Sequence, residues 1–233
     1  MEYGLRKIEY EGDTSSGVCV IRPVSAEYKS PGGYSGPVLD ALRHDHQNED
    51  GKVFFANVLI ENWNVELSPW EAPPVFGDER FGAGADELLA FITRELIPHT
   101  DRTYGKKKYV IMGYSMAGLF ALYAVYNSDL FDAVAAVSPS GWFPGWIEYA
   151  REHDPLARYV YLSLGEKEEF NNNAIMSSVG SRIRCMEHIL QEKGIPVTLE
   201  WNPGGHFRNP DIRMAKGVGS VLLNISPENN ETA

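Results

Sequence analysis

The stretch YVIMGYSMAGLFALYAVY, residues 109–126, decides the fold of this chain. It begins with a short, continuously apolar run, which is typical of a strand covered on both faces of a parallel sheet. It ends with an almost entirely apolar segment, which predicts a buried helix. The six residues GYSMAG, at 113–118, must form a tight turn between these two elements. The stretch therefore predicts a strand, a sharp turn and a helix, with a serine at the turn.

The residues around Ser115 meet the requirements of a nucleophile elbow. The positions two before and two after the serine must be small, because the backbones of the strand and the helix approach each other there. Gly113 and Ala117 satisfy this, with alanine where the usual pattern has glycine. At the helix N-terminus, the backbone N–H of Met116 can then stabilise negative charge that develops near the serine. The alternative is a glycine-rich connection in which Ser115 only caps the helix.

Strand and helix patterns alternate along the rest of the chain. Further strands are predicted at 18–24, 53–60, 133–137, 159–164 and 197–201. One helix is predicted at 85–97, closed by Pro98, and another from Val179 to Leu190, stopped by Gly194. This alternation indicates an α/β fold with a mostly parallel sheet and helices on both faces. In such sheets the ligand site lies beyond the carboxyl ends of the strands.

The composition narrows the class of protein. The length of 233 residues suits one α/β domain, expected over residues 1–226, followed by a disordered polar tail at 227–233. The net charge of −11 argues against a nucleic-acid partner, because phosphate binding needs concentrated positive charge. Its two cysteines form no disulfide framework. No apolar stretch is long enough for a membrane span and no signal peptide is visible, so a cytoplasmic protein is expected.

A histidine that could act as a base follows the last predicted strand. His206 lies in NPGGHF, residues 202–207, directly after the strand at 197–201. The glycines of this loop let a histidine reach over the strand ends toward the serine. The other five histidines lack this setting. Two of them, in His44-Asp45-His46, could suggest a metal site, but the polar residues around them favour a solvated loop, so no metal is expected.

An acid is predicted in the loop after the strand at 159–164. An elbow hydrolase needs serine, acid and histidine in this chain order, and the acid orients the imidazole and stabilises its charged form. Glu166, Glu168 and Glu169 all follow Gly165 and compete for this role. We favour Glu168, with Glu169 second. A cluster of carboxylates is also typical of a solvated loop, so at most one of the three is expected to point inward.

Three motifs, in this order along the chain, resemble one group of esterases. They are the elbow at 113–118, the sequence SLGEKEE at 163–169 and the sequence WNPGGHF at 201–207. The group contains esterase D, feruloyl esterase-like and enterochelin esterase-like α/β-hydrolases. Parts of the stretch from Asn62 to Asp86 also resemble small bacterial members. The resemblance covers roughly residues 50–210, and the ordered set of motifs is far more specific than any single one.

The resemblance implies hydrolysis of a small-molecule carboxylic ester without a cofactor. It assigns Ser115 as the nucleophile, His206 as the general base and an acid to the 166–169 loop. It also implies a second oxyanion donor after the third strand of the fold. In this chain that donor is expected to be the backbone N–H of Asn62 or Trp63.

Aromatic residues in loops after predicted strands are candidates for the substrate pocket. Trp142 is the foremost, because it closes the sequence SPSGW that follows the strand at 133–137. Trp70 is a further candidate, and Asn62 is a polar one. The alternative is that tryptophans in loops form lids or small cores of their own.

Two other functions compete with ester hydrolysis. A thioesterase, deacetylase or acyltransferase would use the same triad, because the shared step is acylation of Ser115. A non-catalytic binding module could also keep this fold. The order of serine, acid and histidine argues against that second alternative.

Overall fold

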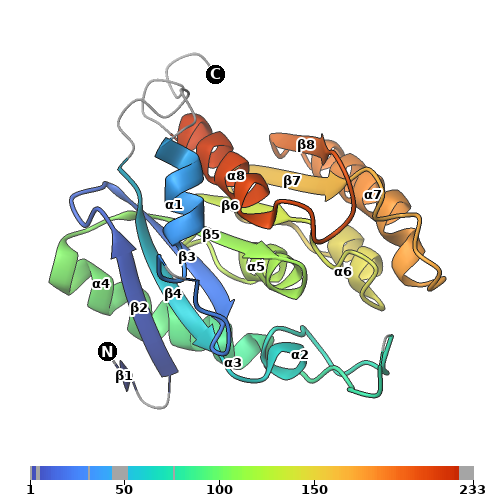
Figure 1. Ribbon diagram of the computed structural model, residues 1–233, viewed down its shortest axis with the longest axis horizontal. Helices are drawn as coiled ribbons and strands as arrows, with labels where there is room; N and C mark the ends of the chain where they lie inside the picture. Colours follow the sequence, from blue (N-terminus) through green and yellow to red (C-terminus); the bar gives the residue numbers. More distant parts are fainter. Residues whose placement is uncertain (1, 4–5, 31, 44–51, 76, 226–233) are drawn as a thin grey trace.

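In the part of the chain that the structure describes, eight strands form one sheet in the order β1-β2-β4-β3-β5-β6-β7-β8 (Figure 1). The computed structural model describes residues 2–3, 6–30, 32–43, 52–75 and 77–225. The polar tail expected at 227–233 and the histidines at 44 and 46 lie outside these residues.

Six of the strands are mutually parallel, and each lies within two residues of a strand that the sequence predicts. They are β3 (Val18–Ser25), β4 (Phe54–Ile60), β5 (Lys108–Tyr114), β6 (Ala133–Val137), β7 (Tyr159–Gly165) and β8 (Val197–Asn202). At the edge of the sheet, β2 (Arg6–Gly12) pairs antiparallel with β4, and the short β1 (Glu2–Tyr3) pairs antiparallel with β2. The predicted mostly parallel α/β sheet is therefore confirmed.

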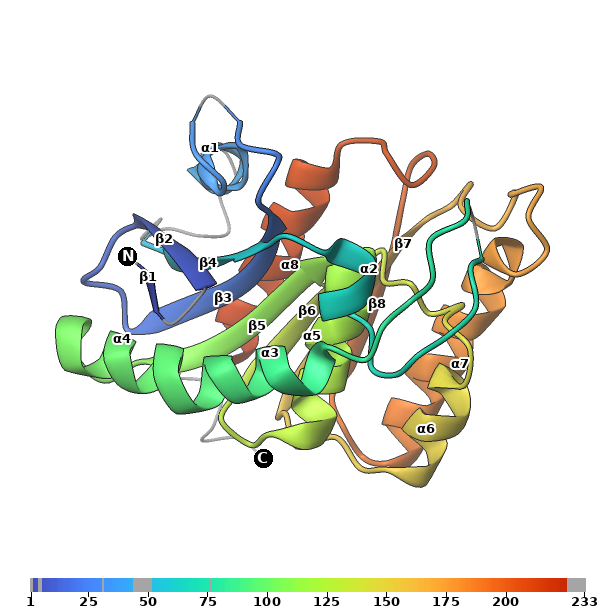
Figure 2. The ribbon, with the colours of Figure 1, turned by 90° about the horizontal axis from the view of Figure 1, so that it is seen from below.

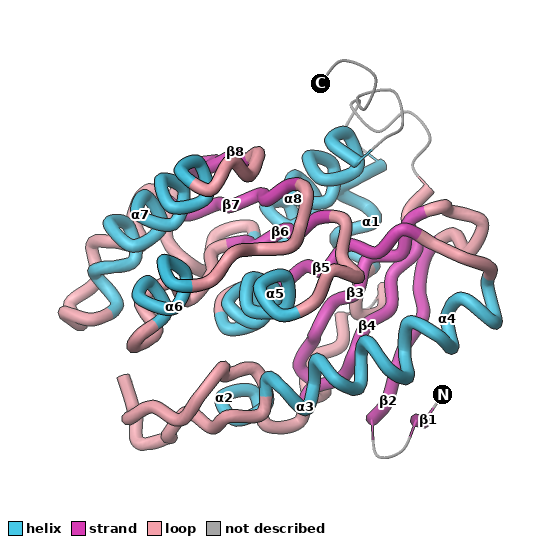
Figure 3. Tube along the Cα trace, turned by 180° about the vertical axis from the view of Figure 1, so that it is seen from behind, coloured by secondary structure: helices cyan, strands magenta, loops and turns pink. Residues whose placement is uncertain are grey.

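Helices cover both faces of the sheet (Figure 2). One face is covered by α1 (Gly36–Arg43) and α8 (Pro210–Ile225). The other is covered by α3 (Ala85–Phe91), α4 (Ile97–Tyr104), α5 (Met116–Asn127), α6 (Trp146–Glu152) and α7 (Val179–Glu192). Figure 3 shows this larger layer lying over the strands. Among the described residues, no helix is long and apolar enough to cross a membrane.

The two helical layers explain why the central strands are continuously apolar. In β6, Ala135 and Val137 pack on the side of α8, whereas Val134 and Ala136 pack on the side of α5. Successive side chains of a strand point to opposite faces, so a sheet that is covered twice needs apolar residues at every position.

The helix predicted to close at Pro98 is longer than expected, so that prediction was wrong. The helix continues through Tyr104, and a π-helical turn at Ile92–Leu96 separates α3 from α4. This turn changes the hydrogen-bond pairing directly before the proline, which then lies in the first turn of α4. The proline has no N–H to donate, and the changed pairing of the π-helical turn lets the helix continue without that hydrogen bond.

Helix α8 was not predicted, although it carries a residue that matters for the site. Its sequence contains Gly217 and Gly219, and glycine disfavours a helix by about 1 kcal/mol relative to alanine. Packing overrides this preference. A Cβ at Gly217 would lie 3.2 Å from the ring of Tyr161, so the small residue lets α8 lie directly on the sheet.

Candidate active site

Ser115 lies at the tight turn that joins β5 to α5. Its backbone has φ 60° and ψ −121°. Such a conformation costs a residue with a side chain about 1–3 kcal/mol and is concentrated at functional sites. Gly113 is required there, because a Cβ at this position would lie 2.0 Å from the carbonyl oxygen of Ala117. The turn thus has the geometry of a nucleophile elbow, with the serine hydroxyl at the edge of a cavity.

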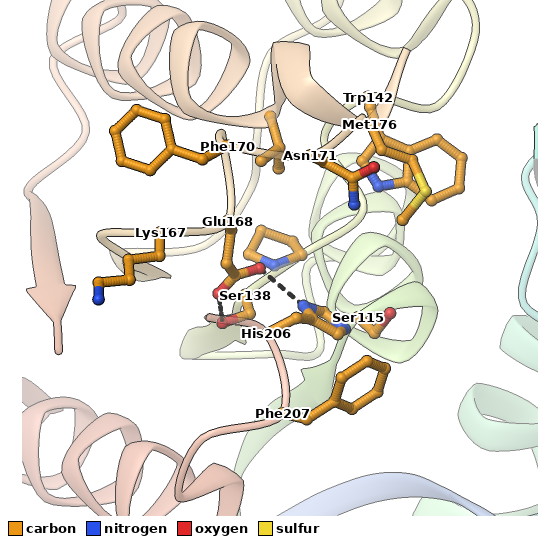
Figure 4. A pocket seen from close by; sticks show the side chains of 12 residues that line it. Ser115, Ser138, Trp142, Lys167, Glu168, Phe170, Asn171, Met176, His206 and Phe207 are labelled. Carbon is orange, nitrogen blue, oxygen red and sulfur yellow. Dashed lines mark hydrogen bonds and ion pairs between the residues drawn. The ribbon is translucent and has the colours of Figure 1, made fainter. Parts of the chain in front are cut away.

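The loops after β7 and β8 bring Glu168 and His206 together. Nδ1 of His206 lies 2.7 Å from Oε2 of Glu168 (Figure 4). The two strands are parallel neighbours, so their loops leave the sheet side by side. A backbone hydrogen bond of 3.1 Å from Lys167 N–H to the carbonyl of Gly204 joins the two loops.

The Glu168 carboxylate is buried and surrounded by donors. Only 4% of its side chain is exposed. Its second oxygen, Oε1, accepts hydrogen bonds from Gly165 N–H at 2.7 Å, Ser138 Oγ at 2.8 Å and Arg213 Nη1 at 3.0 Å. Burial raises the pKa of Glu168, but the hydrogen bond and charge of His206, together with the Gly165 and Ser138 donors, lower this pKa by more. The net result is a pKa below the ordinary value, so the carboxylate is ionised at neutral pH.

The other two carboxylates of this loop point elsewhere. Glu166 is exposed. Glu169 accepts a hydrogen bond of 3.1 Å from Arg184 on α7, and the side chains of both residues are partly exposed to solvent. Of the three acids that the sequence leaves in competition, the structure therefore brings Glu168 to the histidine.

The ionised Glu168 determines which nitrogen of His206 carries a proton. A carboxylate can only accept hydrogen bonds, so Nδ1 of His206 must be the protonated nitrogen. The lone pair is then on Nε2, and that edge of the ring lies toward Ser115 (Figure 4). In this arrangement the imidazole can take a proton from the serine hydroxyl.

A cavity of about 520 Å³ opens beside these three residues. Its wall contains Ser115, Glu168 and His206, and also the apolar side chains of Trp142, Phe170, Met176, Val179 and Phe207. Two of the aromatic rings, Phe170 and Phe207, are 77% and 90% exposed and therefore lie at the rim. The cavity has the size and largely apolar lining of a small-molecule site.

Of the three predicted pocket residues, the structure brings only Trp142 to this cavity. Trp70 instead packs against Phe143, with ring centroids 5.8 Å apart, and its Nε1–H donates to the carbonyl of Pro144 at 2.8 Å. It belongs to a small aromatic core behind the site. Asn62 is exposed and borders a separate cavity between β2 and α3.

The two expected oxyanion donors lie at the carboxyl edge of the sheet. Met116 supplies the first N–H of α5, which has no acceptor within the helix. Trp63 begins the short helix α2 (Trp63–Glu66), at the same edge as the start of α5 (Figure 2). Asn62 is excluded as the alternative donor, because its N–H donates to Oε1 of Glu66 at 2.8 Å. Trp63 therefore stays the predicted second donor.

Sequence reasoning missed three side chains that support the acid and the base. Arg213 of α8 and Ser138, after β6, both bind Glu168. Tyr114, next to Ser115, donates a hydrogen bond to the carbonyl oxygen of His206. Of these three residues, only Arg213 could have been found from the sequence, because an arginine within an otherwise apolar helical face is unusual. That pattern becomes visible only once α8 is known to be a helix.

Within the described ranges, no group of three or more histidine, cysteine, aspartate or glutamate side chains is arranged to hold a metal ion.

The sheet, the elbow and the ordered loops at its carboxyl edge define an α/β-hydrolase. The chain belongs to the family described as "Putative esterase", whose model matches residues 57–208, more than half of its length. The protein is therefore a carboxylic ester hydrolase. No curated protein matches the chain.

Several solved structures with a similar fold are named as hydrolases or esterases. The siderophore hydrolase EstA from Aspergillus nidulans has 18% identity and a TM-score of 0.68, over 98% of this chain and 91% of its own. The enterobactin esterase FES from Shigella flexneri has 18% identity and a TM-score of 0.68, over 94% of this chain and 56% of its own. A ferulic acid esterase has 14% identity and a TM-score of 0.56, over 94% and 95%. At these identities the likeness shows the fold.

Proposed function

We propose that the protein hydrolyses carboxylic esters through an acyl-enzyme on Ser115, with His206 as general base and Glu168 as the acid of the triad. The observation that carries the proposal is the hydrogen bond between Nδ1 of His206 and a buried, ionised Glu168, at the cavity that also contains Ser115. This bond gives the imidazole the tautomer that a base needs.

The reaction then has two halves. His206 Nε2 removes the proton of Ser115 as the serine oxygen attacks the ester carbonyl, and the N–H groups of Met116 and Trp63 bind the oxyanion. The alcohol leaves with the proton that His206 returns to it. In the second half, water attacks the acyl-enzyme and loses a proton to His206. His206 then returns this proton to the Ser115 oxygen as the bond to the acyl group breaks and the carboxylic acid product is released.

The substrate is a small ester whose apolar part faces Trp142 and Met176. Both side chains lie on one side of Ser115, and the ring of Phe207 lies on the other (Figure 4). The similar structures are named for siderophores and ferulic acid, so esters of these compounds belong in a first substrate panel beside simple alkyl esters. The panel would be ranked by kcat/KM at fixed pH.

Replacement of the nucleophile tests the proposal. Ser115→Ala should lower kcat for a 4-nitrophenyl ester by at least about 10⁴-fold while the circular dichroism spectrum stays unchanged. A fluorophosphonate probe should label the wild type but not this variant. The matched control is Ser140→Ala, whose hydroxyl lies 3.5 Å from that of Ser115 and should not be needed for labelling. Full activity in Ser115→Ala would refute the mechanism.

A further inference from the structure

Arg213 is a buried cation that the ester chemistry itself does not require. Only 2% of its side chain is exposed, on a helix whose neighbouring buried positions are apolar. Burial of a guanidinium is costly unless its donors are paired, so an arginine at such a position needs strong partners. Its partners all belong to the candidate active site.

The two arms of the Arg213 guanidinium reach different loops. Nη1 binds Oε1 of Glu168 at 3.0 Å and Ser138 Oγ at 3.1 Å, on the side of the acid. Nη2 donates to the carbonyls of Pro203 at 3.2 Å and Gly205 at 2.9 Å, on the side of the base. Because the guanidinium is rigid and planar, it sets the separation of these two loops.

Tyr114 provides a second connection, from the nucleophile to the base. It directly precedes Ser115, and its hydroxyl donates to the carbonyl of His206. Nη1 of Arg213 lies 3.4 Å from the same hydroxyl. Burial raises the pKa of Tyr114, and although Ser138 and Arg213 oppose this, the net shift is upward, so the phenol keeps its proton and stays a donor.

We propose that Arg213 and Tyr114 are positioning residues. They hold the loop of His206 so that its imidazole faces both Ser115 and Glu168. Neither side chain is among the residues that line the cavity, so neither acts on the substrate directly. Both act through His206: Tyr114 binds its backbone carbonyl, and Arg213 binds carbonyls of the preceding loop residues. The inference rests on the proposed function of Ser115, His206 and Glu168.

A lysine at position 213 cannot replace this arrangement. Its ammonium carries the same charge but is a single point, without the planar fork that reaches both loops at once. Arg213→Lys should therefore lower kcat by about 10–100-fold, because a displacement of a catalytic group by about 1 Å has this effect. KM should stay within about 2-fold of the wild type, because no substrate contact is lost.

Arg184 offers a matched control. It also pairs with a glutamate of the 166–169 loop, but Arg184 and Glu169 are 52% and 27% exposed. Arg184→Lys should leave kcat and KM unchanged. The double variant Glu168→Gln/Arg213→Lys should lose less activity than the product of the two single losses, because Arg213 acts partly through Glu168.

The measurements are kcat and KM for a 4-nitrophenyl ester, with thermal melting to confirm that each variant is folded at the assay temperature. A folded Arg213→Lys enzyme with wild-type kcat would overturn the proposal. If this variant does not fold, Tyr114→Phe decides: a loss in kcat of about 3–10-fold, the equivalent of one hydrogen bond, supports the proposal and wild-type kcat overturns it. Activity that does not depend on Ser115 in the wild type would instead refute the proposed function.

Discussion

Glu168 and Glu169 are neighbours in the chain, and each pairs with an arginine, yet the two pairs differ in nearly every physical respect. The Glu168–Arg213 pair is 4% and 2% exposed and lies beneath the candidate active site. The Glu169–Arg184 pair is 27% and 52% exposed and lies on the surface of α7. Both contain hydrogen bonds of about 3 Å, at 3.0 Å and 3.1 Å.

Burial, rather than residue type or distance, therefore decides what each of these ion pairs contributes. Water screens the charges of the outer pair and can replace either partner in its hydrogen bonds. Exposed ion pairs therefore contribute only about 0–1 kcal/mol to stability. The inner carboxylate is only 4% exposed, so loss of a partner leaves it poorly solvated. Its orientation is therefore fixed by four hydrogen bonds, and this is what makes it suitable for holding His206.

The largest contrast between the two glutamates is expected in activity. Glu168→Gln should lower kcat on the order of 10⁴-fold, because an amide can donate to Nδ1 of His206 and so favour the wrong tautomer. Glu169→Gln should leave kcat unchanged. Steady-state kinetics on one ester would measure both, and equal losses in the two variants would contradict the assignment of the acid.

A second contrast is expected in stability. Arg213→Met leaves the buried Glu168 carboxylate without its cation and should lower the free energy of unfolding by about 3–5 kcal/mol. Arg184→Met removes a solvated partner and should cost no more than about 1 kcal/mol. Urea denaturation followed by circular dichroism would give both values. A small effect at Arg213 would mean that water enters the site when the arginine is removed.

Two glycines that pack against these carboxylates provide a third, smaller contrast. A Cβ at Gly165 would lie 2.8 Å from Oε1 of Glu168 and 2.5 Å from the backbone oxygen of Gly204. Gly165→Ala should therefore destabilise the protein by about 1–3 kcal/mol. The three atoms nearest to a Cβ at Gly180 all belong to the Glu169 side chain, whose partly exposed carboxylate can move into solvent. Gly180→Ala should be close to neutral in thermal melting, since alanine also favours the helix.

The smallest expected effect concerns acid stability. The pKa of Glu168 in the folded protein lies below its ordinary value of 4.5, so in acid the unfolded chain binds this proton first. The contribution of Glu168 is thus complete above about pH 4.5 and is lost as the pH falls through the folded pKa. Unfolding free energy measured from pH 6 to pH 3 should fall less steeply for Glu168→Gln than for the wild type. Identical slopes would contradict the shift.

Local sequence patterns predicted most of the fold and the elbow. The six parallel strands are short apolar runs, and a strand that is buried on both faces has this signature wherever it occurs. The turn at Ser115 was predictable because it requires small residues two positions before and two positions after the serine, and these are visible in the sequence. Helix α8 and the continuation of α4 past Pro98 were missed, because their local propensities point the other way and packing overrules them.

By itself the sequence determined an α/β-hydrolase fold, the serine at its elbow and the histidine that follows the last strand. Only the tertiary structure decided which of three nearby glutamates meets His206, which tryptophan lines the cavity, and that Arg213 lies beneath the acid. The physical reason is the range of the forces involved. Backbone geometry and apolar periodicity act between neighbours in the chain, whereas burial and charge pairing depend on residues that folding brings together, such as Glu168 and Arg213, 45 positions apart.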